Sequence, residues 1–400
     1  MKFKKLSLSA WVVASMSLAA CSGGDKKADA AGSASGAGSN VIKIASVSPL
    51  SGVTANSGKD NQSGALLAVE EINAKGGIDV AGKKYMLELV SEDDAADPKQ
   101  GTTVAQKIAD DKSISAVVGH YNSGVTMVAQ PIYANAGLVA LTPSASNPDV
   151  TNKAVKGPNG LNMMYRMVAH DGMQGPALAT YAQKKGIKTL AIVDDATTYG
   201  KGNADKVEQK AKELGITVVS RESATDKTTD FKAILAKIKA NNVDGIMWGG
   251  LDDTGATFAK QARELGITST LLVPDAVCTD NFITLAGDAA KGAVCSTTGV
   301  PLEEMKEGAA FKERFEKRFP GQKVQGFAPF AYDAVLTLVE AIKKAGSTEP
   351  AKVAEAMKGI TATGLSGPIA FDDATGERKD TEITILQEKD KKFVIVDKIK

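Results

Sequence analysis

Polar side chains follow several apolar, strand-like segments of this sequence, and their types are suited to binding a small charged ligand. After the run SAVVG come His120, Tyr121, Asn122 and Ser123, where a helix is expected to begin. The first N–H groups of a helix lack intrahelical partners, so Ser123 and these amides could bind an anion such as a carboxylate. The alternative is that Ser123 only caps its own helix.

A second polar turn follows the run LVALT. It is bounded by Pro143 and Pro148 and contains Ser144 and Ser146. If both strands belong to one parallel sheet, their carboxyl ends meet at the same edge, where such sheets bind ligands. The alternative is an ordinary turn of Ser, Asn and Pro residues.

The second half of the chain places different chemistry after its strand-like runs. Tyr199 follows LAIVDD, Leu251 and an Asp pair follow GIMWGG, and Asp275 follows STLLVP. Asp275 and Tyr199 suit an ammonium group, whereas the serines of the first half suit a carboxylate. We therefore expect a zwitterion to bind between the two halves, and we interpret the Asp252–Asp253 pair as solvated charge.

Motifs for catalysis are missing from the sequence. It contains no phosphate loop, no GxGxxG after a strand, no HExxH and no GxSxG. With two histidines, a Ser-His-Asp triad would have to use His120 or His170. We expect no enzyme activity, no cofactor and no metal, and a hydrolase that uses His120 stays as an alternative.

Strand-like segments alternate with helix-like segments of 10–15 residues. The alternation occurs in two successive parts of the chain, and the first begins with VIKIASVSPL and a helical run at 58–77. This alternation is typical of βαβ units. It predicts the α/β class, with two doubly wound parallel-sheet lobes joined by a hinge. The late segment 381–400 reads as a β-hairpin, and late segments could complete both lobes.

The N-terminus has the features of an export signal. A basic start, Met1–Lys5, precedes an apolar run too short to span a bilayer, which ends in Leu18-Ala19-Ala20-Cys21. This ending looks like a lipobox, in which Cys21 would be lipidated, although a plain secretory signal is the alternative. The next residues are almost all small or polar and predict a flexible tether. No later run is long and apolar enough to span a membrane, so the lipid would be the only anchor.

Charge and cysteine content limit the possible partners. Without residues 1–20, the chain has 45 basic and 47 acidic residues, a balance that argues against nucleic-acid binding. Besides Cys21, only Cys278 and Cys295 remain. In an exported protein an even pair predicts a disulfide.

Several motifs, taken in order, resemble the periplasmic leucine/isoleucine/valine-binding proteins of ABC transporters, which have the type I substrate-binding fold. They are SPLSGVTANSGKDNQSGALLAVEEINAKGGI, VVGHYNSGVTMVAQPIYANAGLVALTPSASNPDVT, IVDDATTYGKG, WGGLDDTGATFAKQARELG and LAGDAAKGAVCS. The likeness covers Val41 to Lys400. It implies a two-lobed protein, a monomer, that closes on an amino acid and delivers it to a membrane permease.

The resemblance also implies residue roles. Ser123, Ser144 and Ser146 would hold the α-carboxylate, and Asp275 with the turn's backbone would hold the α-ammonium. Tyr199 would close over the ligand. Phe327 would lie beside the ligand side chain.

The sequence departs from the family at the expected side-chain pocket. Ser57 stands where a tyrosine is common, and Leu251 stands where an aromatic residue is common. These changes could enlarge the pocket or make it more polar. Asp275 replaces a commoner Glu, and the pair Cys278/Cys295 would brace the second lobe beside it.

The combined prediction is an extracytoplasmic, membrane-anchored lipoprotein of the periplasm that captures an aliphatic amino acid of the branched-chain class. A sensor of the same fold and a binder of a small amide or urea are the alternatives. The expected segments are 1–20 for the signal peptide, 21–40 for the linker, 41–168 with 299–377 for the N-lobe, and 169–298 with 378–400 for the C-lobe.

Overall fold

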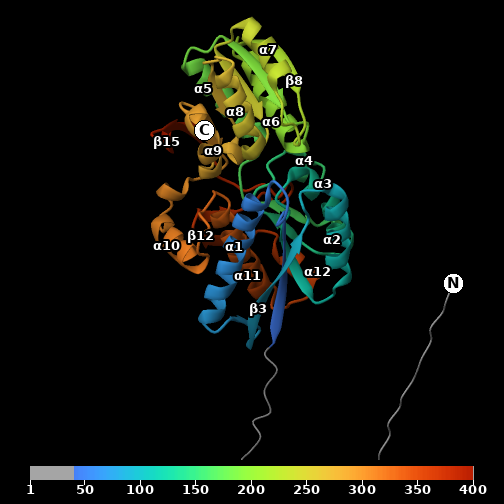
Figure 1. The fold of residues 1–400 in the computed structure, drawn as a ribbon. Coiled ribbons are helices and arrows are strands. Elements are labelled where there is room, and N and C mark those ends of the chain that lie inside the picture. The colour runs from blue at the N-terminus through green and yellow to red at the C-terminus, as the bar shows by residue number, and fades with distance from the viewer. Residues whose placement is uncertain (1–39, 400) are drawn as a thin grey trace, which may run out of the picture. The chain divides into compact units, whose positions relative to one another are not determined.

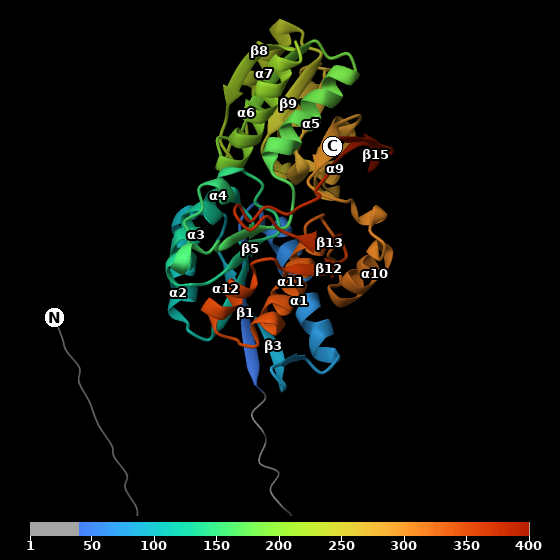
Figure 2. The ribbon, with the colours of Figure 1, turned by 180° about the vertical axis from the view of Figure 1, so that it is seen from behind.

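Two β-sheets, each covered by helices on both faces, make up the part of the chain that the structure describes, residues 40–399. The structure is a computed structural model. The expected signal segment, Cys21 and the tether lie outside the described residues. Figures 1 and 2 show the two lobes from opposite sides.

The first sheet has the strand order β2-β3-β1-β4-β5-β6. All neighbouring pairs are parallel except β2 with β3, which form an antiparallel edge. The strands are β1 (Val41–Ser48), β2 (Ile78–Val80), β3 (Lys83–Asp93), β4 (Ile114–Gly119), β5 (Ala140–Thr142) and β6 (Met164–Arg166).

Helices cover this sheet because side chains alternate along its strands. In β1, Ile42 and Ile44 join one apolar cluster, whereas Ala45 and Val47 join another on the opposite face. The first cluster lies under α1 and α11, which run side by side in Figure 1, and the second lies under α2 and α3. The helices of this lobe are α1 (Ala55–Ala74), α2 (Pro98–Asp110), α3 (Ser123–Asn135), α4 (Asp149–Asn152), α10 (Gly308–Arg318), α11 (Ala328–Ala345) and α12 (Pro350–Ala356).

The second sheet has the strand order β15-β14-β11-β10-β9-β7-β8. Its strands from β8 to β11 are parallel, and the hairpin of β14 and β15 adds an antiparallel edge. The strands are β7 (Thr189–Asp194), β8 (Thr217–Ser223), β9 (Gly245–Gly249), β10 (Thr270–Val273), β11 (Val294–Thr297), β14 (Ile383–Lys389) and β15 (Lys392–Ile399).

Side chains alternate in the same way along the strands of the second sheet, and helices cover both of its faces. In β7, Leu190 and Ile192 pack toward α5 and α6, whereas Ala191 and Val193 pack toward α7 and α8. The helices of this lobe are α5 (Asp171–Lys184), α6 (Thr198–Glu213), α7 (Lys232–Asn241), α8 (Asp252–Glu264) and α9 (Asp280–Ala286). A separate two-stranded ribbon of β12 (Thr361–Gly364) and β13 (Gly367–Ala370) belongs to neither sheet.

The chain passes between the two sheets three times, and the passing segments lie against one another. The Arg166 amide donates to Gly376 O over 3.0 Å, and the Ala169 amide donates to Thr298 O over 2.8 Å. The buried Arg166 guanidinium pairs with Glu377, with an Nε–Oε2 distance of 3.0 Å. These contacts define the hinge region.

The predicted α/β fold with two doubly wound lobes is confirmed, and so is the C-terminal hairpin. The sheets differ from the prediction in being mixed. Short turns join β2 to β3 and β14 to β15, which leaves no room for a crossover helix, so both pairs are antiparallel. Strand β14 returns from the other lobe and pairs antiparallel with β11. The lobe boundaries stay a prediction. Among residues 40–399, no helix has the length and apolar character needed to cross a membrane.

Candidate functional site

Residues from both lobes line one cavity. Both lobes contribute through segments that follow the carboxyl ends of their strands, as expected for open α/β sheets. The first lobe contributes Tyr121, Asn122, Ser123, Ser144 and Phe327, and the second contributes Tyr199, Leu251, Asp275 and Ala276. Six of the eight predicted ligand residues therefore come together here, namely Ser123, Ser144, Tyr199, Leu251, Asp275 and Phe327.

The start of α3 forms one end of the cavity. Ser123 is the first residue of this helix, and Asn122 occupies the N-cap position without making a side-chain capping bond. Ser123 thus does not cap its helix; its Oγ accepts a hydrogen bond from the Asn147 amide over 3.2 Å. The first-turn amides of α3 have no side-chain acceptor, and such amides attract anions.

Ser144 lies beside this helix start. Its hydroxyl donates to Tyr121 O over 3.2 Å and accepts from Asn61 Nδ2 over 3.1 Å. These two bonds fix the orientation of the serine toward the cavity. The Ser123 hydroxyl and the first-turn amides of α3 supply donors at this end, which makes it suitable for a carboxylate.

Asp275 forms the opposite end of the cavity, in the second lobe. Its Oδ1 accepts from the Tyr199 hydroxyl over 2.6 Å, and its Oδ2 accepts from Thr298 Oγ1 over 3.1 Å. Burial raises the pKa of this carboxyl above its ordinary value, while the bonds from Tyr199 and Gln174 oppose the shift. A cation in the cavity would restore the charged form, so this end is suited to an ammonium group.

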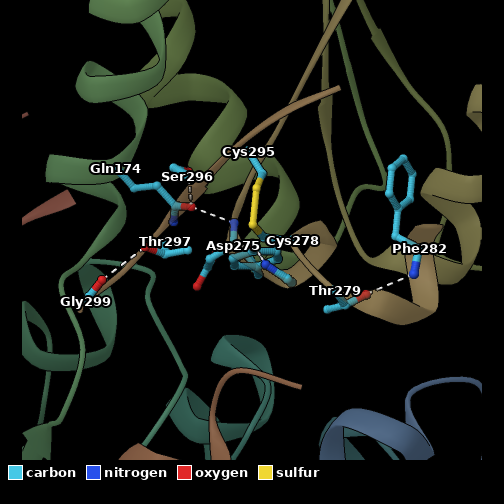
Figure 3. The surroundings of a disulfide bond; sticks show 11 residues. Gln174, Asp275, Cys278, Thr279, Phe282, Cys295, Ser296, Thr297 and Gly299 are labelled. Carbon is cyan, nitrogen blue, oxygen red and sulfur yellow. Dashed lines mark hydrogen bonds between the residues drawn. A yellow bond between two sulfur atoms is a disulfide. The ribbon is translucent and has the colours of Figure 1, made fainter. Parts of the chain in front are cut away.

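The segment that carries Asp275 is braced covalently. The predicted disulfide between Cys278 and Cys295 is confirmed, with a Cα–Cα distance of 5.5 Å. It joins the turn Asp275–Val277 to β11, as Figure 3 shows. Figure 3 also shows the Asp275 amide donating to Gln174 Oε1, over 2.7 Å.

Ser146, a predicted carboxylate ligand, does not line the cavity. It lies at the hinge, where its carbonyl accepts from the Asp171 amide over 2.8 Å. Burial, together with the charge of Asp275, raises the pKa of Asp171 to about 7. Gln174 joins the two acids, because its Nε2 donates to Asp171 Oδ1 over 2.9 Å.

Ser57, the eighth predicted residue, also lies outside the cavity lining. It is buried in α1. Phe327 is held from the same helix, because Asp60 Oδ2 accepts from the Phe327 and Ala328 amides over 3.0 and 2.8 Å. Burial raises the pKa of Asp60 to about 6.

His120 does not face the cavity. Its imidazole is fully buried, with Nδ1 2.8 Å from Asp94 Oδ2 and Nε2 2.9 Å from the Tyr133 hydroxyl. Both ring nitrogens are thus engaged in a structural network. Over residues 40–399, no group of three or more His, Cys, Asp or Glu residues is placed to hold a metal ion.

Sequence reasoning missed three lining residues, Tyr121, Asn122 and Ala276. Asn122 and Ala276 directly adjoin predicted residues, and Tyr121 lies two positions before Ser123, so their position after a strand was the available signal. It also missed Gln174 and Thr298, which hold Asp275 from distant segments. Nothing in the sequence pattern marks those two.

A cavity lined by polar and apolar groups from two lobes is typical of the class of two-lobed solute-binding proteins. A family model described as periplasmic binding protein matches residues 41–392. The chain belongs to this family, so it is a solute-binding protein and not an enzyme, and the hydrolase alternative on His120 is set aside.

Proteins with similar sequences have names that agree with the resemblance to leucine/isoleucine/valine-binding proteins. A "Leucine-, isoleucine-, valine-, threonine-, and alanine-binding protein" of Pseudomonas aeruginosa is 33% identical over 350 residues, which cover 87% of this chain and 90% of the relative. An "Amino acid binding protein" of the same organism is 34% identical over 353 residues, which cover 88% of this chain and 91% of the relative.

Solved structures share the fold over most of the chain. A leucine-binding protein from Thermotoga maritima has a TM-score of 0.80 at 26% identity, covering 90% of this chain and 98% of its own. A branched-chain amino acid binding protein of Streptococcus pneumoniae in complex with isoleucine has a TM-score of 0.79 at 26% identity, covering 89% and 99%. A Rhodopseudomonas palustris protein in complex with 4-hydroxybenzoate, at 21% identity and a TM-score of 0.79, shares the fold alone.

Proposed function

We propose that this protein captures an α-amino acid of the aliphatic class between its lobes and delivers it to an ABC permease. The observation that carries the proposal is the polarity of the cavity. One lobe offers uncapped helix amides with Ser123 and Ser144, and the other offers the buried carboxylate of Asp275. The two ends match the two charges of a zwitterion.

The apolar part of the cavity completes the recognition of an amino acid. Leu251, Ala276 and Phe327 line it and would contact the ligand side chain. Apolar walls with a few placed polar groups are typical of small-molecule sites. Relatives named for leucine, isoleucine, valine, threonine and alanine support the same ligand class.

Lobe closure supplies the mechanism. A ligand that bonds to Ser123 in one lobe and Asp275 in the other has more contacts in the closed state than in the open state. It therefore shifts the population toward closure by this difference in affinity. The Asn147 Nδ2, which donates to Thr198 O across the lobes over 2.8 Å, adds a contact that exists only when the lobes meet.

Export and anchoring belong to the proposal as well. Cys21 would carry the lipid after removal of residues 1–20, and residues 21–40 would tether a monomeric binding body to the periplasmic face of a membrane. The lipobox-like ending and the polar composition of the tether support this arrangement. A palmitate label that is incorporated by the wild type and lost in Cys21→Ala would test it, and equal labelling would contradict it.

Binding by residues 40–400 is measured with valine and two analogues that each lack one charge. Isothermal titration is run with valine, with isovalerate, which lacks the ammonium, and with isobutylamine, which lacks the carboxylate. The proposal predicts that both analogues bind at least about tenfold more weakly than valine, because each loses one charge-assisted set of bonds. Equal binding of valine and either analogue would contradict it.

A further inference from the structure

Gln174, near the start of α5, is fully buried and lies behind the Asp275 end of the cavity without lining it. Its Oε1 accepts from the Asp275 amide over 2.7 Å and from the Ser296 hydroxyl over 2.6 Å, as Figure 3 shows. Its Nε2 donates to Asp171 Oδ1 over 2.9 Å. One side chain therefore connects α5, the turn that carries Asp275 and strand β11.

These contacts require an amide side chain at position 174. Two donors, the Asp275 N–H and the Ser296 O–H, meet at Oε1, whereas a carboxylate oxygen of Asp171 meets Nε2. Glutamine offers an acceptor and a donor at the end of one side chain, and an ionised glutamate offers acceptors only. Because a buried donor that loses its partner costs free energy, removal of this acceptor would leave the Asp275 N–H unpaired or displace the turn.

The same side chain lies next to the hinge. The Asp171 amide donates to Ser146 O over 2.8 Å, and Ser146 belongs to the first-lobe turn that also contains Ser144. A continuous series of hydrogen bonds thus runs from this turn through Asp171 and Gln174 to the Asp275 backbone. It passes through the hinge and joins the two polar ends of the cavity.

The backbone of Asp275 depends on this series more than its carboxylate does. The carboxylate oxygens accept from Tyr199 and Thr298. Among residues 40–399, Gln174 is the one residue whose side chain bonds to the Asp275 backbone. Binding groups must be held within about 0.5 Å of the productive geometry, and supporting hydrogen bonds provide this precision. Loss of the Gln174 amide would therefore let the carboxylate move away from the ligand.

We propose that Gln174 is a positioning residue that acts on ligand affinity through Asp275, by fixing the Asp275 backbone to the hinge. Gln174 does not touch the ligand. It holds Asp275 ready for the ammonium, so that less ordering is left to be done when the ligand binds. This inference rests on the proposed function and deepens it, because it names a residue outside the cavity on which ammonium binding depends.

A double-mutant cycle separates an effect through Asp275 from a general loss of structure. Gln174→Met removes the donor and the acceptor and keeps the length of the side chain, and it is made in the wild type and in Asp275→Asn. Gln130→Met in both backgrounds is the matched control. Gln130 is 3% exposed and does not line the cavity, and its side-chain amide bonds to the Val155 backbone over 2.7 and 2.9 Å. Dissociation constants for valine are measured by isothermal titration.

Gln174→Met is expected to weaken valine binding about tenfold in the wild-type background, the range that an unpaired buried donor gives. In the Asp275→Asn background the same change is expected to cost less than about twofold, because the charge that Gln174 positions is no longer there. A structural defect alone would weaken binding by the same factor in both backgrounds. The control is expected to have equal effects in both.

Gln174→Asn provides a second variant if Gln174→Met does not fold. Its shorter amide withdraws the acceptor from Asp275 without burying new apolar surface, and the same pattern is expected. An equal loss in both backgrounds, or an affinity of the position-174 variants within twofold of the wild type, would overturn the inference and leave amino-acid capture standing. Unchanged binding by Asp275→Asn would overturn it together with the role of Asp275. No binding of any amino acid by the wild type would refute the proposed function itself.

Discussion

Replacing Asp275 by Asn removes the negative charge from the second-lobe end of the cavity and keeps nearly the same shape. The carboxylate oxygens accept from Tyr199 and Thr298, and the residue is only 6% exposed. A charge-assisted hydrogen bond in such a site contributes about 1.5–3 kcal/mol net. At about 1.4 kcal/mol per factor of ten, Asp275→Asn is expected to weaken amino-acid binding by roughly 10- to 150-fold.

The assay is isothermal titration of wild type, Asp275→Asn and the control Asp253→Asn with the same amino acid. Asp253 lies in the same lobe next to Asp252 and does not line the cavity, so its loss should change affinity by less than about twofold. Isovalerate provides a second arm, because it lacks the ammonium. Its binding should stay the same or improve in Asp275→Asn, since a repulsion between two carboxylates is removed.

Acid pH should weaken binding through the same residue. Burial raises the pKa of Asp275 in the unliganded protein, and a bound ammonium favours the ionised form. Binding therefore releases a proton when the pH falls below that raised pKa, and affinity decreases there. The affinity of Asp275→Asn should depend less on pH than that of the wild type. An affinity of this variant within twofold of the wild type would refute the assignment of Asp275 to the ammonium.

Three further predictions concern stability and use urea unfolding of residues 40–400. Burial raises the pKa of Asp171 to about 7, so the native state binds more protons than the unfolded state. The unfolding free energy should therefore fall as the pH rises from about 4 to above 7. In Asp171→Asn this fall should be smaller by on the order of a few kcal/mol, and an unchanged pH dependence would contradict the assignment. The disulfide closes a loop across 17 residues. The double variant Cys278→Ser, Cys295→Ser should therefore have an unfolding free energy about 3 kcal/mol below that of the wild type, whereas an oxidising buffer should leave the wild-type value unchanged. Arg166→Met leaves the Glu377 carboxylate of the hinge without its partner and should destabilise by about 3–5 kcal/mol, whereas a neutral effect would show that water replaces the guanidinium.

The fold could be predicted because its signals are local and repeated. Strand-like runs alternate with helix-like runs, and glycines such as Gly186 and Gly215 end helices in the left-handed conformation that favours glycine. The start of α5 is harder to predict, because proline favours the first turn of a helix and Pro176 alone would place the start several residues too late. In the structure His170 caps that helix, accepting from the Gly172 amide over 3.0 Å, and Pro176 lies inside it.

The site could be predicted in part for a related reason. Ser123, Ser144, Tyr199 and Asp275 directly follow strands, and the topology of each sheet brings such positions to one edge. Spacing along the chain does not reveal side-chain direction within a turn. Ser144 lines the cavity, whereas Ser146, two residues later, is fully buried and does not line it.

Residues that hold the site from a distance could not be found this way. Gln174 approaches Asp275 across 101 positions of sequence, and Asp60 approaches the Phe327 loop across 267. Such contacts depend on how helices pack over the sheets rather than on any local pattern. The cavity-lining Tyr121 is an intermediate case, since its place after β4 was visible but the direction of its ring was not.

A crystal structure of residues 40–400 with the amino acid that binds most tightly tests the central claim most directly. The account predicts one ligand in the cavity, with its carboxylate at the first turn of α3 beside Ser123 and Ser144. Its ammonium should lie within hydrogen-bonding distance of Asp275. A ligand bound in the reverse orientation, or outside this cavity, would contradict the account.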